Sequence, residues 1–149
     1  MIRLRKNQIL SVVMIRMRLP IQAQVIIFTN NPLRFLMLKR PEDKGGFWQP
    51  VTGGVEDGET IEAAAKRELS EETALHPIEW LGEIMRFQFE ENGWWFSEYV
   101  FATRVEAEPI LTEHVEFRWC TLEEAQALVP EHHVEIREAL GLVAQRIGS

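Results

Sequence analysis

The sequence predicts a mixed α/β domain in which helices flank a β-sheet. The runs "QAQVIIFT" (22–29) and "RFLMLKR" (34–40) are rich in β-branched and apolar residues, as strands are. An Asn-Gly pair in "ENGW" separates two longer strand-like runs, 79–90 and 94–104, which is a strong hairpin signal. Between the two strand pairs, the Ala-rich stretch from Thr60 to about Ala74 predicts a helix that Thr60 can cap.

The remaining elements follow from local signals. "NNP" predicts a turn, "PEDKGG" a loop, and "FWQPVTGGVEDGE" short extended pieces that run into a turn. "VEFRWC" (115–120) predicts a strand, and a capping-box pattern from Thr121 to Glu124 opens a helix in "TLEEAQALV". "EHHVEIREALGLVAQRI" (131–147) predicts a terminal helix.

Composition is that of a single globular domain over residues 1–149, with 46% hydrophobic and 26% charged residues. No run approaches the ~18 apolar residues that span a bilayer, so we expect no membrane association. Cys120 is the single cysteine, which excludes an internal disulfide framework and fits a reducing cytoplasm. We interpret it as a small apolar side chain in the core.

Charge is distributed unevenly along the chain, whose net charge is −7. Residues 1–41 carry eight basic side chains and no acidic one, whereas the other 108 residues carry eight basic and 23 acidic side chains. The acidic remainder argues against a stable nucleic-acid complex, because such binding depends on neutralising phosphates. Residues 1–20 predict an N-terminal strand extension, which could serve exchange between the subunits of a homodimer.

The predicted helix at 60–74 places three carboxylates close together. With about 100° per residue, Glu68, Glu71 and Glu72 fall within an arc of about 100°, together with apolar positions that should face the protein body. Like charges at this spacing cost a few tenths of a kcal/mol per pair. Two interpretations remain open: a solvated Glu-rich helix, or a site for Mg²⁺ or Mn²⁺, which prefer oxygen ligands. The glycine-rich loop "TGGVEDGE" favours the second, since glycines let backbone approach a ligand closely.

The residues from Gly53 to Leu75 resemble the signature box of Nudix hydrolases, G-x5-E-x7-R-E-U-x-E-E-x-G-U, where U is a bulky aliphatic residue. Eight of the nine specified positions match. Ala74 stands where the family usually has Gly, and we expect an altered chain direction there without loss of the chemistry. "FWQPVTGGVEDGET" (47–60) and "LTEHVEFRW" (111–119) are similar to the dihydroneopterin triphosphate pyrophosphatase branch of the family.

The resemblance implies a Nudix fold, an α/β/α sandwich around a mixed β-sheet, and hydrolysis of a phosphoanhydride with divalent metal, Mg²⁺ or Mn²⁺. It implies the metal ligands Glu68, Glu71, Glu72, Glu113 and the backbone carbonyl of Gly53. Arg67 and Glu59 would orient the helix carboxylates. Glu113 corresponds to a later glutamate that serves as metal ligand or general base in several family members.

Most candidate substrate contacts lie outside the box. Arg34, Lys39 and Arg40 are either phosphate contacts or surface charges, and His114 is either a phosphate contact or a solvated loop residue. The larger set of candidates adds Gly54 in the loop, Trp48 as a stacking or packing residue, and Glu98 as a further acidic group. His132 and His133 lack the spacing of a zinc site and are expected to be exposed.

These residues predict a Nudix pyrophosphohydrolase acting on a nucleoside triphosphate or a pterin triphosphate. A dinucleoside polyphosphate hydrolase or an RNA 5′-end hydrolase is the rival within enzymes. A non-catalytic module that senses a nucleotide is the rival in another class.

Overall fold

The computed structural model describes residues 20–148. The strand predicted in "QILSVVMIRM" lies outside the described residues. Within them, seven strands form one mixed sheet, and three α-helices and a short 3₁₀ helix accompany it. The strands are β1 (Ile21–Thr29), β2 (Arg34–Lys39), β3 (Trp48–Gln49), β4 (Val51–Gly54), β5 (Glu79–Glu91), β6 (Trp94–Arg104) and β7 (Glu116–Cys120). The helices are η1 (Glu42–Lys44), α2 (Ile61–Thr73), α3 (Leu122–Leu128) and α4 (Val134–Gly148).

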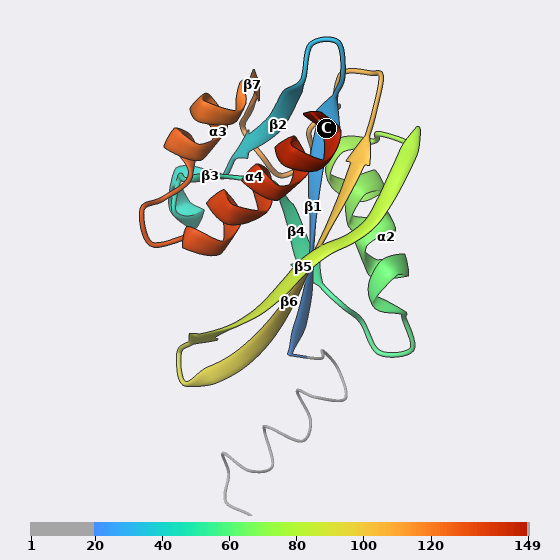
Figure 1. Cartoon of the computed structure of the whole chain (residues 1–149). Helices are drawn as coiled ribbons and strands as arrows, with labels where there is room; N and C mark the ends of the chain where they lie inside the picture. The colour runs from blue at the N-terminus through green and yellow to red at the C-terminus, as the bar shows by residue number, and fades with distance from the viewer. Residues whose placement is uncertain (1–19, 149) are drawn as a thin grey trace, which may run out of the picture.

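Helices cover both faces of the sheet, which confirms the predicted α/β/α sandwich. Helix α2 lies on one face, and α3 and α4 lie on the other (Figure 1). Alternation along β1 creates the two cores. Ala23, Val25 and Ile27 pack with the buried residues of α2, whereas Ile26 and Phe28 pack with those of α3 and α4.

Strand β1 is the centre of the sheet. Along one edge it pairs with β6 in parallel, from Ile21 opposite Ser97 to Phe28 opposite Arg104. Its other edge is shared, because the first half pairs with β4 and only the last two residues pair with β2. Strands β2 and β4 thus divide this edge of β1, and β3, which pairs with β2, is joined to β4 through Pro50.

The N-terminal end of α2 was predicted correctly, whereas the chain direction at its C-terminal end was not. Thr60 caps the helix by accepting a hydrogen bond from the backbone N–H of Ala63 at 3.1 Å. Ala74 ends it in the left-handed conformation (φ 60°), with its N–H bonded to the carbonyl of Ser70. The altered chain direction expected there was wrong, because alanine adopts the conformation that glycine usually supplies at this position.

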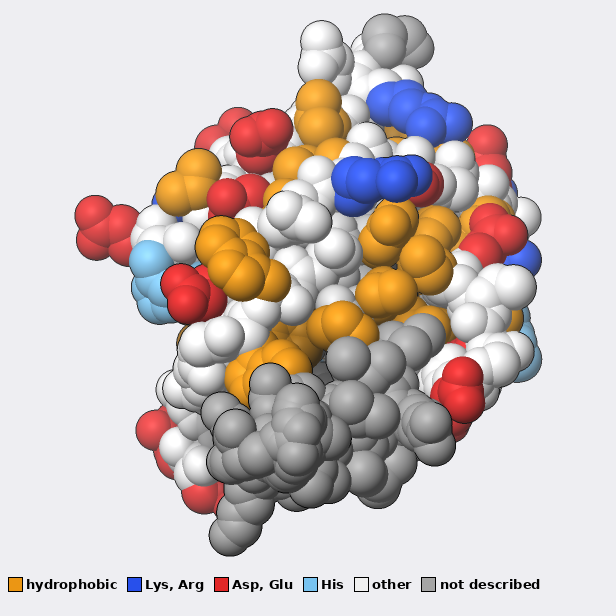
Figure 2. All heavy atoms as spheres, turned by 90° about the horizontal axis from the view of Figure 1, so that it is seen from below, with side chains coloured by type: hydrophobic (Ala, Val, Ile, Leu, Met, Phe, Trp, Pro, Cys, Tyr) orange, Lys and Arg blue, Asp and Glu red, His pale blue; other side chains and the backbone are white. Residues whose placement is uncertain are grey.

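The outer surface shows two further features. The end of the β5–β6 hairpin extends beyond the body of the molecule (Figure 1), and Trp95 at this end is 63% exposed. Viewed from below, hydrophobic side chains gather across the middle of the face, while acidic side chains lie mainly around its margins (Figure 2). None of the helices in the described range is long and apolar enough to cross a membrane.

Candidate active site

Arg67 joins the glycine-rich loop to helix α2. Its Nε donates to Oε2 of Glu59 at 2.6 Å, and its Nη2 donates to Oε1 of Glu59 at 3.0 Å. The same Nη2 donates to the carbonyl of Gly54 at 3.0 Å. Gly54, a candidate substrate contact, thus has its carbonyl engaged by the helix. The two parallel bonds to Glu59 hold the guanidinium in one orientation.

The third nitrogen of Arg67 reaches two of the helix carboxylates. Nη1 donates to Oε1 of Glu68 at 2.7 Å and to Oε1 of Glu71 at 3.2 Å. The hydrogen bond with Glu59 is the main reason that the pKa of Arg67 is raised, and it lowers the pKa of Glu59. Arg67 therefore remains a cation that offsets part of the repulsion among the carboxylates.

Gly53 lies directly against Glu68. A Cβ on Gly53 would stand 1.9 Å from Oε2 of Glu68 and 2.2 Å from its Cδ. Only glycine leaves room for this carboxylate beside strand β4. The backbone of the loop and the carboxylate that follows it are thereby brought into one small space.

Glu72 is the most buried member of the acidic group, at 4% exposure. Burial, the adjacent carboxyl group of Glu68 and the negative charge of Glu113 raise the pKa of Glu72 to about 9. Its Oε1 is buried without a hydrogen-bond partner. A buried carboxylate between two others is costly unless a proton or a cation offsets it.

The loop before β7 is fastened to the end of α2, and this brings Glu113 and His114 to the carboxylates. The N–H of Ile110 donates to the carbonyl of Thr73 at 2.8 Å, and the hydroxyl of Thr112 donates to the carbonyl of Glu71 at 3.1 Å. Glu113 is exposed beside Glu72.

His114 connects the acidic cluster to strand β3. Its Nδ1 lies 3.9 Å from Oε1 of Glu72 and is buried without a hydrogen-bond partner, whereas its Nε2 lies 3.2 Å from Nε2 of Gln49. Burial lowers the pKa of His114, with the positive charge of Arg40 adding to the effect. The side chain is 6% exposed, so the interpretation of His114 as a solvated loop residue was wrong.

The expectation that all three helix carboxylates turn inward was wrong for Glu71. Its side chain is 60% exposed, against 12% for Glu68 and 6% for Glu72. Arg67 draws Glu71 toward the loop at the margin of the helix, where solvent reaches it. Lys66 and Ser70 of the same helix are also exposed.

The chemistry of these residues fits a hard divalent cation. The donors are carboxylates and a nearby backbone carbonyl, and two buried polar atoms, on Glu72 and His114, have no partner. Over residues 20–148, no three His, Cys, Asp or Glu side chains stand as a finished coordination shell. Glu68 and Glu71 are instead engaged by Arg67, so that ion binding would have to compete with that guanidinium.

A cavity of about 700 Å³ lies on the α4 side of the sheet; we call it the sheet cavity. Its floor contains Gln22, Gln24, Thr52 and Glu98, and Phe47, Phe87 and Phe89 contribute to its walls. It reaches the acidic cluster through Gln49 and Thr52, since Gln49 contacts His114 and Thr52 precedes Gly53. The remaining lining residues are Arg40, Lys44, Pro50, Glu90, Glu91, His132, His133, Glu135 and Ile136.

The predicted substrate contacts separate into different places. Arg40 lines the sheet cavity, with its guanidinium 5.4 Å from the centre of the Phe47 ring. Lys39 lies 3.7 Å from a carboxylate oxygen of Glu42. Trp48 packs against the core on the α4 side under Arg118, and it is absent from the residues lining the sheet cavity.

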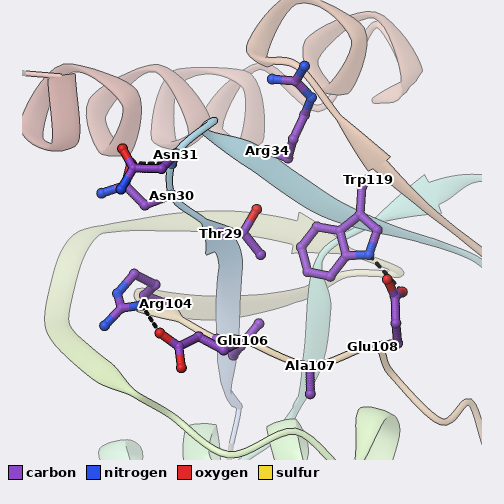
Figure 3. Close-up of a pocket in the computed structure, with 10 residues that line it drawn as sticks. Thr29, Asn30, Asn31, Arg34, Arg104, Glu106, Ala107, Glu108 and Trp119 are labelled. Carbon is purple, nitrogen blue, oxygen red and sulfur yellow. Dashed lines mark hydrogen bonds and ion pairs between the residues drawn. The ribbon is translucent and has the colours of Figure 1, made fainter.

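Arg34 is not brought to the acidic cluster. It lines a second, open cavity of about 770 Å³ at the end of β1, together with Arg104 and Trp119 (Figure 3). There its Nη1 donates to the carbonyl of Leu33 at 2.8 Å.

Sequence reasoning missed most of the sheet cavity. Gln24 carries no motif, and it meets Thr52 of the glycine-rich loop only because the two residues pair across β1 and β4. His133 was expected to be exposed, but it is half-buried in the cavity wall and its Nδ1 has no hydrogen-bond partner. The alternation of polar and apolar residues at the start of β1 was the available signal.

Comparison with known proteins agrees with this geometry. Residues 19–140 match the NUDIX domain model. The chain is 35% identical to a dihydroneopterin triphosphate diphosphatase of Haemophilus influenzae, over 68% of this chain and 73% of the relative. It is 32% identical to an RNA pyrophosphohydrolase of Caulobacter vibrioides, over 62% of this chain and 66% of the relative.

A solved structure adds the three-dimensional comparison. The dihydroneopterin triphosphate pyrophosphohydrolase of E. coli superimposes with a TM-score of 0.66 at 30% identity, covering 83% of this chain and 94% of that one. Fold, signature box and relatives agree. The chain therefore belongs to the Nudix family of hydrolases and is an enzyme that acts on phosphorus-containing acid anhydrides.

Proposed function

We propose that this enzyme hydrolyses a phosphoanhydride bond of a nucleoside triphosphate or a pterin triphosphate with the help of Mg²⁺ or Mn²⁺. The observation that carries the proposal is the buried Glu72, which lies against Glu68 and near Glu113 with one oxygen unpartnered. The names of the relatives from H. influenzae and E. coli, both at 30% identity or more, support a pterin triphosphate as one substrate.

In this proposal, Glu68, Glu71, Glu72, Glu113 and the carbonyl of Gly53 would hold the cation. When bound, it would neutralise phosphate charge and lower the pKa of a water molecule. Two hydrogen bonds to Glu59 hold the guanidinium of Arg67, which donates in turn to Glu68 and Glu71 and would fix the direction of these two carboxylates. Glu113, which is exposed beside Glu72, or one of the helix carboxylates would take the proton of the attacking water.

The basic side chains of the sheet cavity would meet the phosphates. Arg40 and Lys44 line the cavity beside η1, and Gln49 links it to His114 and the carboxylates. A ligand would therefore place its ring over the sheet and its phosphates near Gln49 and His114. Thr52, which lines the cavity, directly precedes Gly53, which lies against Glu68, and this supports the placement.

The test is a substrate panel with product identification, in Mg²⁺ and in Mn²⁺. It contains dihydroneopterin triphosphate, the four dNTPs, diadenosine polyphosphates and RNA with a 5′-triphosphate. We expect release of pyrophosphate or phosphate that EDTA abolishes. No release from any member would favour the nucleotide-sensing alternative.

A substitution of Glu72 tests the metal site without removing a residue of the hydrophobic core. Glu72→Gln should lower kcat by at least about 100-fold and remove the rise in melting temperature that Mg²⁺ produces in the unsubstituted protein. Glu62→Gln, which removes an exposed acid from the same helix, should retain both properties. Full activity in Glu72→Gln would exclude Glu72 as a ligand.

A further inference from the structure

The floor of the sheet cavity is polar where the rest of that sheet face is apolar. Ile26 and Phe28 of β1 lie on this face under α3 and α4, in the buried core. Gln22 and Gln24 precede them on the same face, because side chains alternate along a strand. Register places Gln22 beside Glu98 and Gln24 beside Thr52. The sequence thus changes from apolar to polar where the helices no longer cover the sheet.

Of the three innermost floor residues, Gln24 and Glu98 are buried, and Thr52 is half-buried with its hydroxyl oxygen inaccessible to solvent. Gln24 is 1% exposed and Glu98 is 5% exposed. The amide nitrogen of Gln24 donates to Oε2 of Glu98, which leaves the amide oxygen of Gln24 buried without a partner. The hydroxyl of Thr52 is close enough to affect the pKa of Glu98, yet it too is buried without a hydrogen-bond partner.

This bonding pattern leaves the floor rich in acceptors. One N–H of Gln24 is bonded to Glu98, and an ionised carboxylate has no donor, so the amide oxygen of Gln24 and the carboxylate of Glu98 remain as neighbouring acceptors. Unpartnered polar atoms at this depth destabilise the protein unless a ligand satisfies them. A ligand that satisfies both of these acceptors must therefore present adjacent donors, while the hydroxyl of Thr52 can donate or accept.

The walls suit a flat ring. Phe87 and Phe89 come from β5, with their centroids 6.2 Å apart, and Phe47 comes from the loop after η1. Phe87 pairs directly with Glu98 across β5 and β6, so aromatic surface stands beside the carboxylate. Aromatic side chains stack on the face of a heterocycle whatever hydrogen-bonding groups its edge carries. Discrimination between heterocycles therefore depends on the floor.

We propose that Glu98, with Gln24 and Thr52, selects a 2-amino-4-oxopyrimidine ring, the ring shared by guanine and pterins. The ring N–H and the neighbouring amino group would both donate to the acceptors of the floor. This inference rests on the proposed function. It specifies the substrate class by the hydrogen-bonding edge of the ring that the floor would recognise.

Other common bases do not fit this set of acceptors. Adenine offers a ring nitrogen acceptor beside its amino group, and that acceptor would face the carboxylate. Uracil and thymine offer a single N–H between two carbonyl oxygens. Each mismatch leaves a buried acceptor without a donor, which is the strongest source of discrimination in binding sites.

The experiment compares dGTP, dITP and dATP at pH 8.5, where Glu98 is ionised because its pKa is raised to about 7 by burial. Hypoxanthine differs from guanine only in lacking the 2-amino group. We expect kcat/KM for dGTP to exceed that for dITP by at least 10-fold. In Glu98→Gln the advantage should fall below 3-fold, and dATP should gain at least 10-fold relative to dGTP, because an amide matches adenine.

Glu138→Gln is the matched control, since it removes an exposed carboxylate of α4 that does not line the cavity. Its three ratios should equal those of the unsubstituted protein. Circular dichroism and melting temperature verify that each variant folds. Dihydroneopterin triphosphate in the same assay distinguishes a pterin from a guanine nucleotide as the better substrate.

Binding without chemistry separates this inference from the proposed function. In calorimetry without metal, dGMP should bind at least 5-fold more tightly than dIMP, and Glu98→Gln should abolish the difference. If no triphosphate is hydrolysed but this difference is found, the proposed function fails and the inference stands. An equal loss for all nucleotides in Glu98→Gln, or an unchanged ratio, would overturn the inference.

Discussion

A methyl group on Gly53 would lie 1.9 Å from Oε2 of Glu68, well inside van der Waals contact. The strand and the helix carboxylate therefore depend on each other's positions. Because real Cβ atoms do not approach an oxygen this closely, one of the two must move when a side chain is added.

Gly53→Ala should therefore lower kcat/KM by about 100-fold, because displacement of a catalytic group by about 1 Å has this effect. The melting temperature should change by much less, since the carboxylate can turn toward solvent. Enzyme kinetics and thermal unfolding measure the two effects. Gly141→Ala in α4, where the added Cβ lies 3.6 Å from Gln126, should leave activity unchanged.

Arg67→Lys should lower both stability and activity. It removes the two-point contact with Glu59, and partly buried charged hydrogen bonds of this kind contribute about 1–3 kcal/mol. Chemical denaturation and kcat provide the measurements. Arg86→Lys is the control, because Arg86 makes the same two-point contact with Glu83 but is 62% exposed. A larger loss in the control would contradict the role given to Arg67.

Ala74→Gly should stabilise the protein by about 1 kcal/mol, because Ala74 has φ 60° and glycine adopts this conformation at no steric cost. We expect the melting temperature to rise by about 2–4 °C and kcat to stay unchanged. Ala63→Gly, on the exposed side of the same helix, should instead cost about 1 kcal/mol. Destabilisation by both substitutions would show that the left-handed end of α2 carries no strain.

The stability of the protein should depend on Glu98 through pH. Burial raises the pKa of Glu98 from its usual 4.5 to about 7, although the hydrogen bond from Gln24 opposes the change. Between these values the folded state binds more protons than the unfolded state, so stability falls as pH rises. The full difference is about 3 kcal/mol. It should be complete above pH 7 and absent in Glu98→Gln.

Denaturation of both proteins from pH 4.5 to 8.5 measures this difference. Other ionisable groups line the cavity as well, so the comparison with Glu98→Gln is needed to isolate the contribution of Glu98. They are Arg40, Lys44, Glu90, Glu91, His132, His133 and Glu135. Parallel pH profiles for the two proteins would contradict a raised pKa at Glu98.

The features that could be predicted from the sequence depend on residues that are close together in the chain. Thr60 and Thr121 cap their helices as expected, the latter in a full capping box with Glu124. The Asn-Gly pair makes the β5–β6 hairpin, with Asn92 and Gly93 both at positive φ. The acidic cluster was found because its members are close in the chain and their spacing is helical.

What the sequence did not predict depends on pairing between distant segments. Gln24 and Glu98 meet because β1 and β6 pair in parallel across more than 70 residues, and no local pattern signals that register. The exposure of Glu71 depends on which partner Arg67 reaches, and a helical projection contains no information on this. His133 likewise becomes part of a cavity wall only through the packing of α4 on the sheet.

The division of β1 between two cores has an evolutionary consequence. Side chains at the odd-numbered positions of β1 pack against α2, the helix that would bind phosphate through its metal ion. Side chains at the even-numbered positions at the start of the strand form the floor that would hold the ring. Point mutations at Gln22, Gln24 or Glu98 can therefore alter which molecule is accepted while the hydrolytic half is inherited intact. A lineage built on this strand can diversify its substrates one residue at a time without reinventing its reaction.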